Sequence, residues 1–318
     1  MKVLPVIALA VTLALAGWLW TPDLDRATLE ARYARSPADF IEVAGIRLHV
    51  RREGPADAPA VVLLHGFGAS LQSYDAWAAA LGADYHVIRY DLPGAGLTGP
   101  DPSGDYSDAR SIEVLTALLD ALGIERAIVA GHSIGGRMAW RFAAARPDRV
   151  SRLVLIAPDG FASPGFEYGK APAVPAALNL MRHVLPKTLL RMNVEPGYAQ
   201  PGFVDAALLA RYHDLLRAPG VRQALLDRMR QTVLVEPRAL LAQIPVPTLL
   251  LWGEADRLIP IANAQDYLAA LPQAKLVSLP GIGHLPHEEA PAATVALLRE
   301  FIGSPASPAD TALAQKSK

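Results

Sequence analysis

The sequence predicts an α/β protein: a mostly parallel sheet flanked by helices, with a helical cap inserted after the sixth strand. Three observations lead to this prediction. Short apolar runs recur along the chain, as expected of strands buried on both faces of a parallel sheet. Segments with apolar residues at helical spacing separate most of these runs, which indicates a three-layer α/β sandwich. The alternation is interrupted between residues 161 and 243, where no convincing strand series occurs.

Composition limits the class of protein. The chain has 318 residues, of which 52% are hydrophobic and 19% charged, and this describes a folded protein with a large core. The net charge of −1 and the lack of a basic block argue against nucleic-acid binding. The chain has no cysteine, so disulfides, thiolate catalysis and Cys-ligated metals are excluded.

The N-terminal segment, residues 1–22, is a separate element. Lys2 precedes an apolar run from Val3 to Trp20, whose length is close to the minimum for a membrane-spanning helix. Trp18 and Trp20 are aromatic residues of the kind that lie at a membrane–water interface. We therefore expect an uncleaved signal anchor in a bacterial inner membrane, with the rest of the chain in the periplasm or outside.

Two alternatives are open for this segment. Ala14-Leu15-Ala16 resembles the cleavage site of a signal peptide, which would give a cleaved and secreted form. The segment could instead be a buried core helix.

Residues 23–160 are expected to form the first part of the α/β core. Thr21–Ala38 is polar and helix-like, which suggests a stalk, and Phe40–Val43 with Ile46–Val50 suggests a β-hairpin. The further strands are expected at Val61–His65, Val87–Asp91, Ala127–Gly131, Leu153–Ala157, Thr248–Trp252 and Leu276–Leu279.

Helices are expected between these strands. Apolar residues recur at helical spacing from Ile112 to Leu122, with Ser107 or Asp108 as the N-cap. Another helix is expected over Gly135–Ala145, ended by Pro147. Residues 244–302 are expected to complete the core, and 303–318 to form a disordered tail.

The interruption, residues 161–243, is rich in Leu and Met and includes a helical run from Asp205 to Leu216. We interpret it as a cap over the carboxyl ends of the strands, because ligands bind there in open α/β sheets. The alternative is a helical subdomain with no role in substrate access. A cap of this composition favours an apolar acyl or aromatic group in the substrate, although Leu and Met at helical spacing also serve as simple core.

The most informative motif is Gly131-His132-Ser133-Ile134-Gly135, which follows a predicted buried strand and opens a predicted helix. This is the G-x-S-x-G pattern of a nucleophile elbow. A sharp strand-to-helix turn holds the serine in a strained conformation and needs glycines beside it. Ser133 is therefore the candidate nucleophile. The alternative is a glycine-rich turn with a bystander serine.

A serine nucleophile needs a base, and the base needs an orienting acid. His284 lies in a glycine-rich loop after the last predicted strand and is the candidate base, with His287 as its competitor. Asp256 follows the preceding buried strand and is the candidate acid, with Glu254 and Asp159 as alternatives.

The oxyanion hole is expected from His65-Gly66-Phe67-Gly68, which directly follows a predicted strand. The backbone N–H groups of Phe67 and Ile134 are the candidate donors. We expect His65 to shape this loop rather than to take part in catalysis. Asp91 is expected to brace loops.

Together these residues resemble the α/β-hydrolase fold family, in the branch of esterases, lipases and meta-cleavage C–C hydrolases. The motifs that carry the resemblance are His65-Gly66-Phe67-Gly68, Asp91-Leu92-Pro93-Gly94, Gly131-His132-Ser133-Ile134-Gly135-Gly136, Asp256 and Gly283-His284. The resemblance implies a serine acyl-enzyme mechanism with no metal or organic cofactor. Ser133 argues against haloalkane dehalogenases and epoxide hydrolases, which have Asp at the elbow.

We therefore expect a serine hydrolase that cleaves carboxylic esters of small, apolar substrates through a Ser133–His284–Asp256 triad. A C–C bond or lactone hydrolase with the same triad is one alternative. A non-catalytic binding protein on the same fold is the other.

Overall fold

The computed structural model describes residues 17, 19–162 and 167–303. Its centre is an eight-stranded sheet with the strand order β1-β2-β4-β3-β5-β6-β7-β8. β1 and β2 form an antiparallel hairpin, β2 is antiparallel to β4, and the other neighbours are parallel. The strands are β1 (Phe40–Val43), β2 (Ile46–Glu53), β3 (Ala60–Leu64), β4 (His86–Tyr90), β5 (Ala127–His132), β6 (Val150–Ile156), β7 (Thr248–Gly253) and β8 (Ala274–Leu279).

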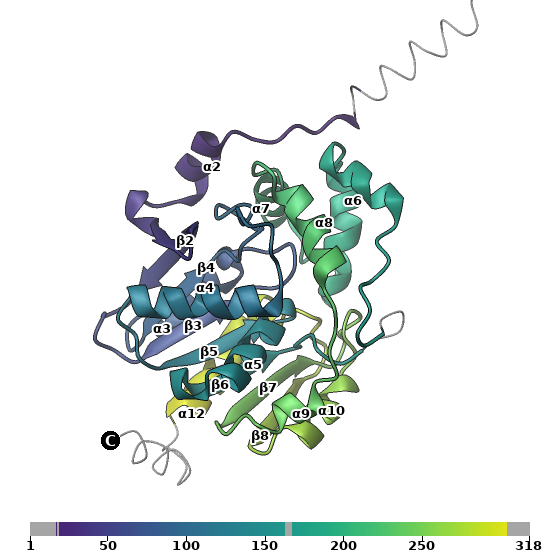
Figure 1. The fold of residues 1–318 in the computed structure, drawn as a ribbon. Coiled ribbons are helices and arrows are strands. Elements are labelled where there is room, and N and C mark those ends of the chain that lie inside the picture. Colours follow the sequence, from purple (N-terminus) through teal and green to yellow (C-terminus); the bar gives the residue numbers. More distant parts are fainter. Residues whose placement is uncertain (1–16, 18, 163–166, 304–318) are drawn as a thin grey trace, which may run out of the picture.

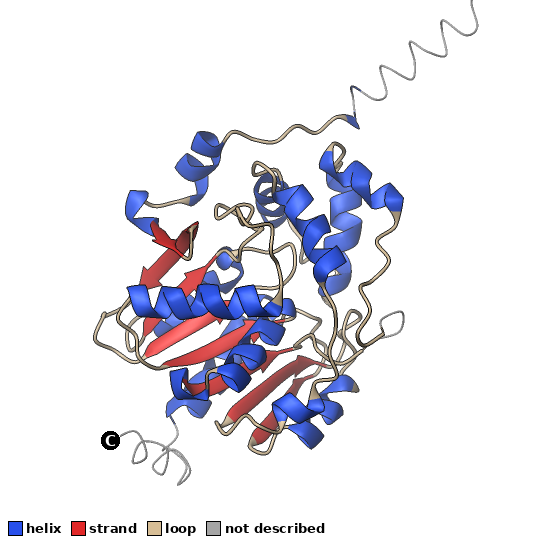
Figure 2. Ribbon diagram, viewed as in Figure 1, coloured by secondary structure: helices blue, strands red, loops and turns tan. Residues whose placement is uncertain are grey.

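Helices cover both faces of this sheet, as Figure 2 shows. The α-helices outside residues 161–243 whose bounds the structure describes are α2 (Arg26–Tyr33), α3 (Asp75–Leu81), α4 (Asp108–Ala121), α5 (Ile134–Ala145), α10 (Asn263–Ala270), α11 (Pro286–Glu289) and α12 (Pro291–Gly303). Apolar side chains of α4, α5 and α10 pack on one face, and those of α3 and α12 pack on the other. The three layers confirm the predicted fold class.

The sequence of β3 shows why the sheet is buried on both sides. Val62 and Leu64 belong to the apolar cluster on one face, whereas Val61 and Leu63 belong to the cluster on the other. Successive side chains of a strand point to opposite faces, so an uninterrupted apolar run needs helices on both. Because β3 to β8 run parallel, their carboxyl ends lie along one edge of the sheet, and the loops that follow them meet there.

Between β6 and β7 the chain forms helices, and no strand occurs in the described part of residues 161–243. We call this segment the helical insertion. It contains η4 (Ala176–Arg182), α6 (Lys187–Val194), η5 (Glu195–Gly197), α7 (Ala206–Leu216), α8 (Val221–Gln231) and α9 (Arg238–Leu241). α6, α7 and α8 lie together at one end of the molecule (Figure 1). Their apolar residues pack with Leu97 and Leu285, which lie in the loops after β4 and β8.

The N-terminal helix α2 differs from the expected stalk. Its Leu29 is fully buried in the apolar cluster of the helical insertion. Arg32 pairs with Asp214 of α7, and Arg26 donates to the backbone carbonyl of Leu97 at 3.1 Å. The stalk interpretation is therefore wrong. A helix with one buried apolar residue has the sequence pattern of a solvent-exposed helix. Leu29 is buried because the helical insertion packs against it.

The expected signal anchor falls largely on residues 1–16 and 18, and almost all of the expected tail on 304–318. Both ranges lie outside the described residues. Among the residues that the structure describes, no helix has the length and apolar character needed to cross a membrane.

Candidate active site

Ser133 lies at the turn between β5 and α5, and its backbone has φ 54° and ψ −120°. A non-glycine residue at positive φ is strained, and such strain is typical of functional turns. The neighbouring glycines are required by close packing. A Cβ on Gly135 would collide with the carbonyl oxygens of Leu64 and His65, and a Cβ on Gly136 would lie 2.8 Å from Pro158. Glycine at positions 135 and 136 is therefore required by the packing of this turn.

His284 and Asp256 come together from the loops after β8 and β7. Nδ1 of His284 lies 2.7 Å from Oδ2 of Asp256, and both side chains are buried. The other oxygen of Asp256 accepts hydrogen bonds from the backbone N–H groups of Leu258 and Ile259, at 2.8 and 2.9 Å. These bonds fix the carboxylate, which in turn fixes the proton of His284 on Nδ1. Nε2 of His284 is left as the basic nitrogen of the ring.

The two alternative acids lie elsewhere. Glu254 accepts a hydrogen bond from the hydroxyl of Ser278 at 2.8 Å, on the protein surface. Asp159 faces Arg137 at 3.4 Å, and its backbone N–H donates to the carbonyl oxygen of Ser133 at 3.0 Å. Burial raises the pKa of Asp159, although the charge of Arg137 opposes this shift. Among the three candidate acids, Asp256 is the one that contacts His284.

The residue before the candidate nucleophile contacts the candidate base. Nε2–H of His132 donates to the backbone carbonyl of His284 at 2.9 Å, and the two rings lie 4.5 Å apart. Burial, reinforced by the charges of His284 and His287, holds the pKa of His132 well below its usual range. His132 is therefore a neutral residue that ties the elbow to the loop of His284.

His287, the competing base, has a different environment. It is buried, its ring stacks on Tyr74 at 4.6 Å, and neither of its nitrogens has a hydrogen-bond partner among the described residues. Burial lowers the pKa of His287 to about 3, so the ring is neutral at physiological pH. With no carboxylate bonded to its ring, His287 lacks the orienting acid that a general base requires.

The loop after β3 places Phe67 beside the elbow. A Cβ on Gly66 would lie 3.4 Å from Cβ of Ser133, so the backbone of this loop runs directly past the serine. The N–H of Ile134 opens helix α5, where first-turn donors have no carbonyl partner within the helix. Within the described residues the N–H of Phe67 has no acceptor either. Both expected oxyanion donors are thus unpaired and close to Ser133.

His65 and Asp91 hold this region in shape. Nδ1–H of His65 donates to the carbonyl of Gly66 at 2.8 Å, and its Nε2 accepts from the N–H of Leu92 at 2.9 Å. Asp91 is fully buried, accepts from His49 at 2.8 Å, and also accepts from the backbone N–H groups of Leu71 and Leu97. These bonds agree with the structural roles expected for His65 and Asp91.

Sequence reasoning missed a set of contacts that join the helical insertion to the loop of His284. The carboxylate of Glu289 accepts from the backbone N–H of Gln200 at 2.6 Å and from that of Gly283 at 2.7 Å. The hydroxyl of Tyr198 donates to Glu288 at 3.0 Å. Two adjacent acidic residues normally indicate a solvated loop, so nothing in the sequence points to these contacts.

No cluster of His, Asp and Glu among the described residues has the arrangement of a metal site. Ser133, His284 and Asp256 are of the residue types with which a histidine–carboxylate pair activates a serine nucleophile, and the described contacts join His284 to Asp256 and to the neighbour of Ser133. The comparisons with known proteins agree with this class of chemistry. A family model for the alpha/beta hydrolase fold matches residues 59–291.

The chain belongs to the α/β-hydrolase fold family. One relative is the 2-hydroxy-6-oxononadienedioate/2-hydroxy-6-oxononatrienedioate hydrolase of Cupriavidus pinatubonensis, which is 29% identical over 81% of this chain and 91% of that protein. A bacterial membrane phospholipase A of known structure is 26% identical, with a TM-score of 0.71, over 95% of this chain and 98% of that one. The enol-lactonase of Burkholderia xenovorans shares the fold, at 24% identity and a TM-score of 0.72, over 83% of this chain and 100% of that one.

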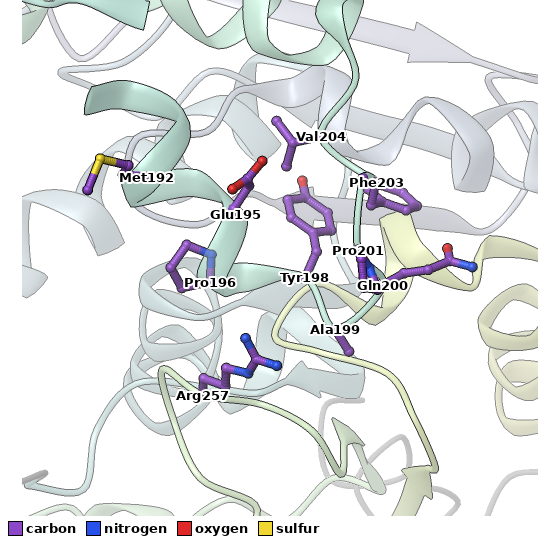
Figure 3. A pocket seen from close by; sticks show the side chains of 11 residues that line it. Met192, Glu195, Pro196, Tyr198, Ala199, Gln200, Pro201, Phe203, Val204 and Arg257 are labelled. Carbon is purple, nitrogen blue, oxygen red and sulfur yellow. The ribbon is translucent and has the colours of Figure 1, made fainter. Parts of the chain in front are cut away.

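In this α/β hydrolase an open cavity of about 470 Å³ adjoins the candidate site. Arg257, which follows Asp256 directly, lines it together with Pro196 and Tyr198 of the insertion (Figure 3). Ser133 and His284 do not line this cavity. We therefore do not assign this cavity as the position of the reacting carbonyl.

Proposed function

We propose that this protein is a serine hydrolase that cleaves carboxylic esters through an acyl-enzyme. The observation that carries the proposal is the 2.7 Å contact between His284 and Asp256, together with the strained backbone of Ser133 at the elbow. A buried carboxylate bonded to Nδ1 of a histidine stabilises the imidazolium that forms when Nε2 takes a proton.

In the first half of the reaction, Oγ of Ser133 bonds to the ester carbonyl carbon while its proton passes to Nε2 of His284. Negative charge develops on the carbonyl oxygen, which the N–H groups of Phe67 and Ile134 stabilise. The bond from the carbonyl carbon to the alcohol oxygen then breaks, and His284 gives its proton to the leaving alcohol. The acyl group remains on Ser133.

In the second half, His284 takes a proton from water, and the resulting hydroxide attacks the acyl carbon. The bond to Oγ of Ser133 breaks, and His284 returns the proton to Oγ. The carboxylic acid leaves, and the enzyme regains its starting state. The sequence consumes the ester and one water molecule and releases the alcohol and the carboxylic acid.

For the substrate, we propose an ester with an apolar acyl chain, such as a lipid. The similarity to the membrane phospholipase covers 95% of this chain, against 83% for the lactonase, so it includes residues outside the common catalytic core. The apolar cluster of the helical insertion includes Leu97 and Leu285, which belong to loops at the carboxyl edge of the sheet. An apolar acyl chain would find matching surface at this edge.

For the location, we propose that residues 1–22 form a signal anchor in a bacterial inner membrane and that the catalytic domain lies in the periplasm or outside. The support is the apolar run from Val3 to Trp20 and the similarity to a protein described as a membrane phospholipase. The mass of the mature protein and its partition between membrane and soluble fractions test this location.

The proposed activity is tested with p-nitrophenyl esters from acetate to palmitate and with phospholipid vesicles, using wild type and Ser133→Ala. We expect hydrolysis by the wild type with a preference for longer acyl chains, and none above background by Ser133→Ala. Activity that persists in Ser133→Ala would contradict the assigned nucleophile.

A second candidate function is cleavage of a C–C bond or a lactone with the same residues. The observation that favours it is the 29% identity to the hydrolase of Cupriavidus pinatubonensis. A panel that contains a 2-hydroxy-6-oxo-dienoate and an enol-lactone separates the candidates. Turnover of these substrates without turnover of any ester would favour C–C bond or lactone hydrolysis over ester hydrolysis. No turnover of any substrate by a folded protein would favour a binding role.

A further inference from the structure

Large apolar side chains are exposed on η4 and α6 of the helical insertion and on Trp20, which pairs with the segment between them. Trp20, Leu180, Leu189 and Met192 are 56%, 64%, 52% and 68% exposed, and Leu178 is 38% exposed. Leu189 and Met192 lie three residues apart on α6, so they share one side of that helix, while Leu190 between them is buried. We call these five exposed residues the outer insertion face.

The N-terminal apolar run ends on this face. Trp20 forms an isolated antiparallel bridge with Val184, which lies between η4 and α6, and its ring stacks on His183 at 5.0 Å. The backbone N–H of Thr21 donates to the carbonyl of His183 at 2.7 Å. Figure 1 shows the start of the described chain beside the helices of the insertion.

Further contacts fix the chain immediately after Trp20 to the insertion. The guanidinium of Arg222 pairs with Asp23 at 2.6 Å, and Arg217 donates to the carbonyl of Pro22 at 2.8 Å. Leu24 donates to the carbonyl of Arg217, also at 2.8 Å. No free linker separates Trp20 from the insertion, so whatever holds residues 1–20 also lies next to the outer insertion face.

Within residues 171–194, which carry four of the five residues of this face, every charged side chain is basic, while Asp23, Glu195 and Asp227 lie beside this segment. Residues 171–194 contain Arg182, Lys187 and Arg191 and no Asp or Glu. Arg191 pairs with Glu195, whereas Lys187 makes no ion pair among the described residues and Arg182 bonds only to the neutral oxygens of Asn179 and Gln223. Exposed aliphatic and aromatic side chains with unneutralised cations are the pattern of a surface that lies in the headgroup layer of an anionic membrane.

We propose that the outer insertion face docks onto an anionic lipid bilayer, with Leu180, Leu189 and Met192 in the headgroup–acyl boundary. This proposal rests on the proposed membrane anchor and goes beyond it, because it assigns a second contact made by the folded domain itself. Docking brings the insertion, and with it the loops it covers, to the surface that holds the lipid substrate.

The absence of cysteine gives a clean test, because any introduced thiol is unique. Single variants Leu180→Cys, Leu189→Cys and Met192→Cys of the full chain are labelled with an environment-sensitive fluorophore. Asp57→Cys is the matched control, since Asp57 is exposed in the turn before β3, at the opposite edge of the sheet. Each protein is reconstituted into phosphatidylcholine vesicles with or without phosphatidylglycerol, and spin-labelled lipid is used as the quencher.

We expect the spin-labelled lipid to quench the three labels on the face by about half or more, and to leave the label at Asp57 nearly unchanged. Quenching should be stronger in vesicles that contain phosphatidylglycerol than in vesicles of phosphatidylcholine alone. The double substitution Arg182→Glu and Lys187→Glu should remove this difference between the two vesicle types. A thermal melt of each labelled variant verifies the fold, and hydrolysis of soluble p-nitrophenyl butyrate is measured separately.

Each contrary result identifies what failed. If the protein co-floats with the vesicles in a density gradient but no label on the face is quenched more than the label at position 57, docking is contradicted and the membrane anchor is still supported. Protein that does not float would overturn both. A catalytically inactive protein whose face labels are quenched would support docking and contradict only the proposed ester hydrolysis.

Discussion

The backbone N–H of His284 donates a hydrogen bond to the backbone carbonyl of Gly197 over 2.7 Å. The candidate base is therefore attached directly to the helical insertion. Glu289 reinforces this attachment, because its carboxylate accepts from Gln200 in the insertion and from Gly283, the residue before His284. The position of the insertion and the position of the base are thus set by the same contacts.

Glu289→Gln should reduce activity without preventing folding. An amide offers one acceptor where the carboxylate offers two, so one backbone N–H loses its partner at a cost of about 1 kcal/mol. We expect kcat to fall by about tenfold with a smaller change in KM, because the loop of His284 is less well placed. Steady-state kinetics with a thermal melt checks this, and an unchanged kcat would mean that the attachment does not position the base.

Asp256→Asn should remove most of the activity and leave the fold intact. The amide can still accept from the N–H groups of Leu258 and Ile259, but it no longer stabilises the imidazolium of His284. Loss of this role costs about 10⁴-fold in kcat in a serine triad. Glu254→Gln is the matched control, since the Glu254 side chain bonds to Ser278 on the surface, and this variant should retain wild-type activity. Equal losses in the two variants would contradict the assignment of Asp256.

Two glycine substitutions should separate a catalytic effect from a folding effect. Ala at Gly66 places its Cβ 2.6 Å from Nδ1 of His132, a side chain that can shift and disturb the elbow. We expect Gly66→Ala to lower kcat by about 10²-fold with a small change in melting temperature. Ala at Gly135 meets backbone carbonyls that cannot move, so Gly135→Ala should mainly destabilise the fold. The reverse pattern in kinetics and melting would show that the loop of Phe67 is not close to the reaction.

The buried ring of His287 should make the protein sensitive to mild acid. Its pKa is lowered to about 3 in the folded state and is about 6.5 in the unfolded chain. Below pH 6.5 the unfolded state binds a proton that the folded state does not, so stability is lost as pH falls from about 6.5 to about 3. The slope is at most about 1.4 kcal/mol per pH unit for this group.

His287→Phe removes the titrating nitrogens and keeps a ring to stack on Tyr74. The free energy of unfolding of this variant, measured by denaturant titration from pH 8 to 4, should fall less steeply with acid than that of the wild type. The pKa of His132 is also lowered, so His132 contributes to the decrease in the free energy of unfolding with acid in both proteins. Parallel pH profiles would rule out His287 as a source of acid sensitivity.

Local patterns were sufficient to predict the sheet and the elbow. An apolar run such as Val61–Leu64 predicts a strand that is buried on both faces of the sheet. The glycines around Ser133 are required by close contacts at a single turn. His284 and Asp256 were identifiable because each follows a predicted buried strand in a loop at the same edge of the sheet. The structure brings these two residues within hydrogen-bond distance.

The contacts of the helical insertion could not be predicted in this way. Burial of Leu29 and the bonds of Glu288 and Glu289 depend on where the insertion packs, and that position is set by many weak apolar contacts between distant segments. An exposed face such as that of Leu189 and Met192 also looks like ordinary helix core in the sequence. Only the structure distinguishes it from Leu190, which is buried.

The central claim is that Ser133 is a nucleophile activated by His284. The most direct test is reaction of the full-length protein with a fluorophosphonate, followed by intact mass and peptide mapping. We expect one adduct per chain, on the peptide that contains Ser133, with none in Ser133→Ala and much slower labelling in His284→Gln. A folded wild-type protein that gains no adduct, or gains it on another residue, would contradict the account.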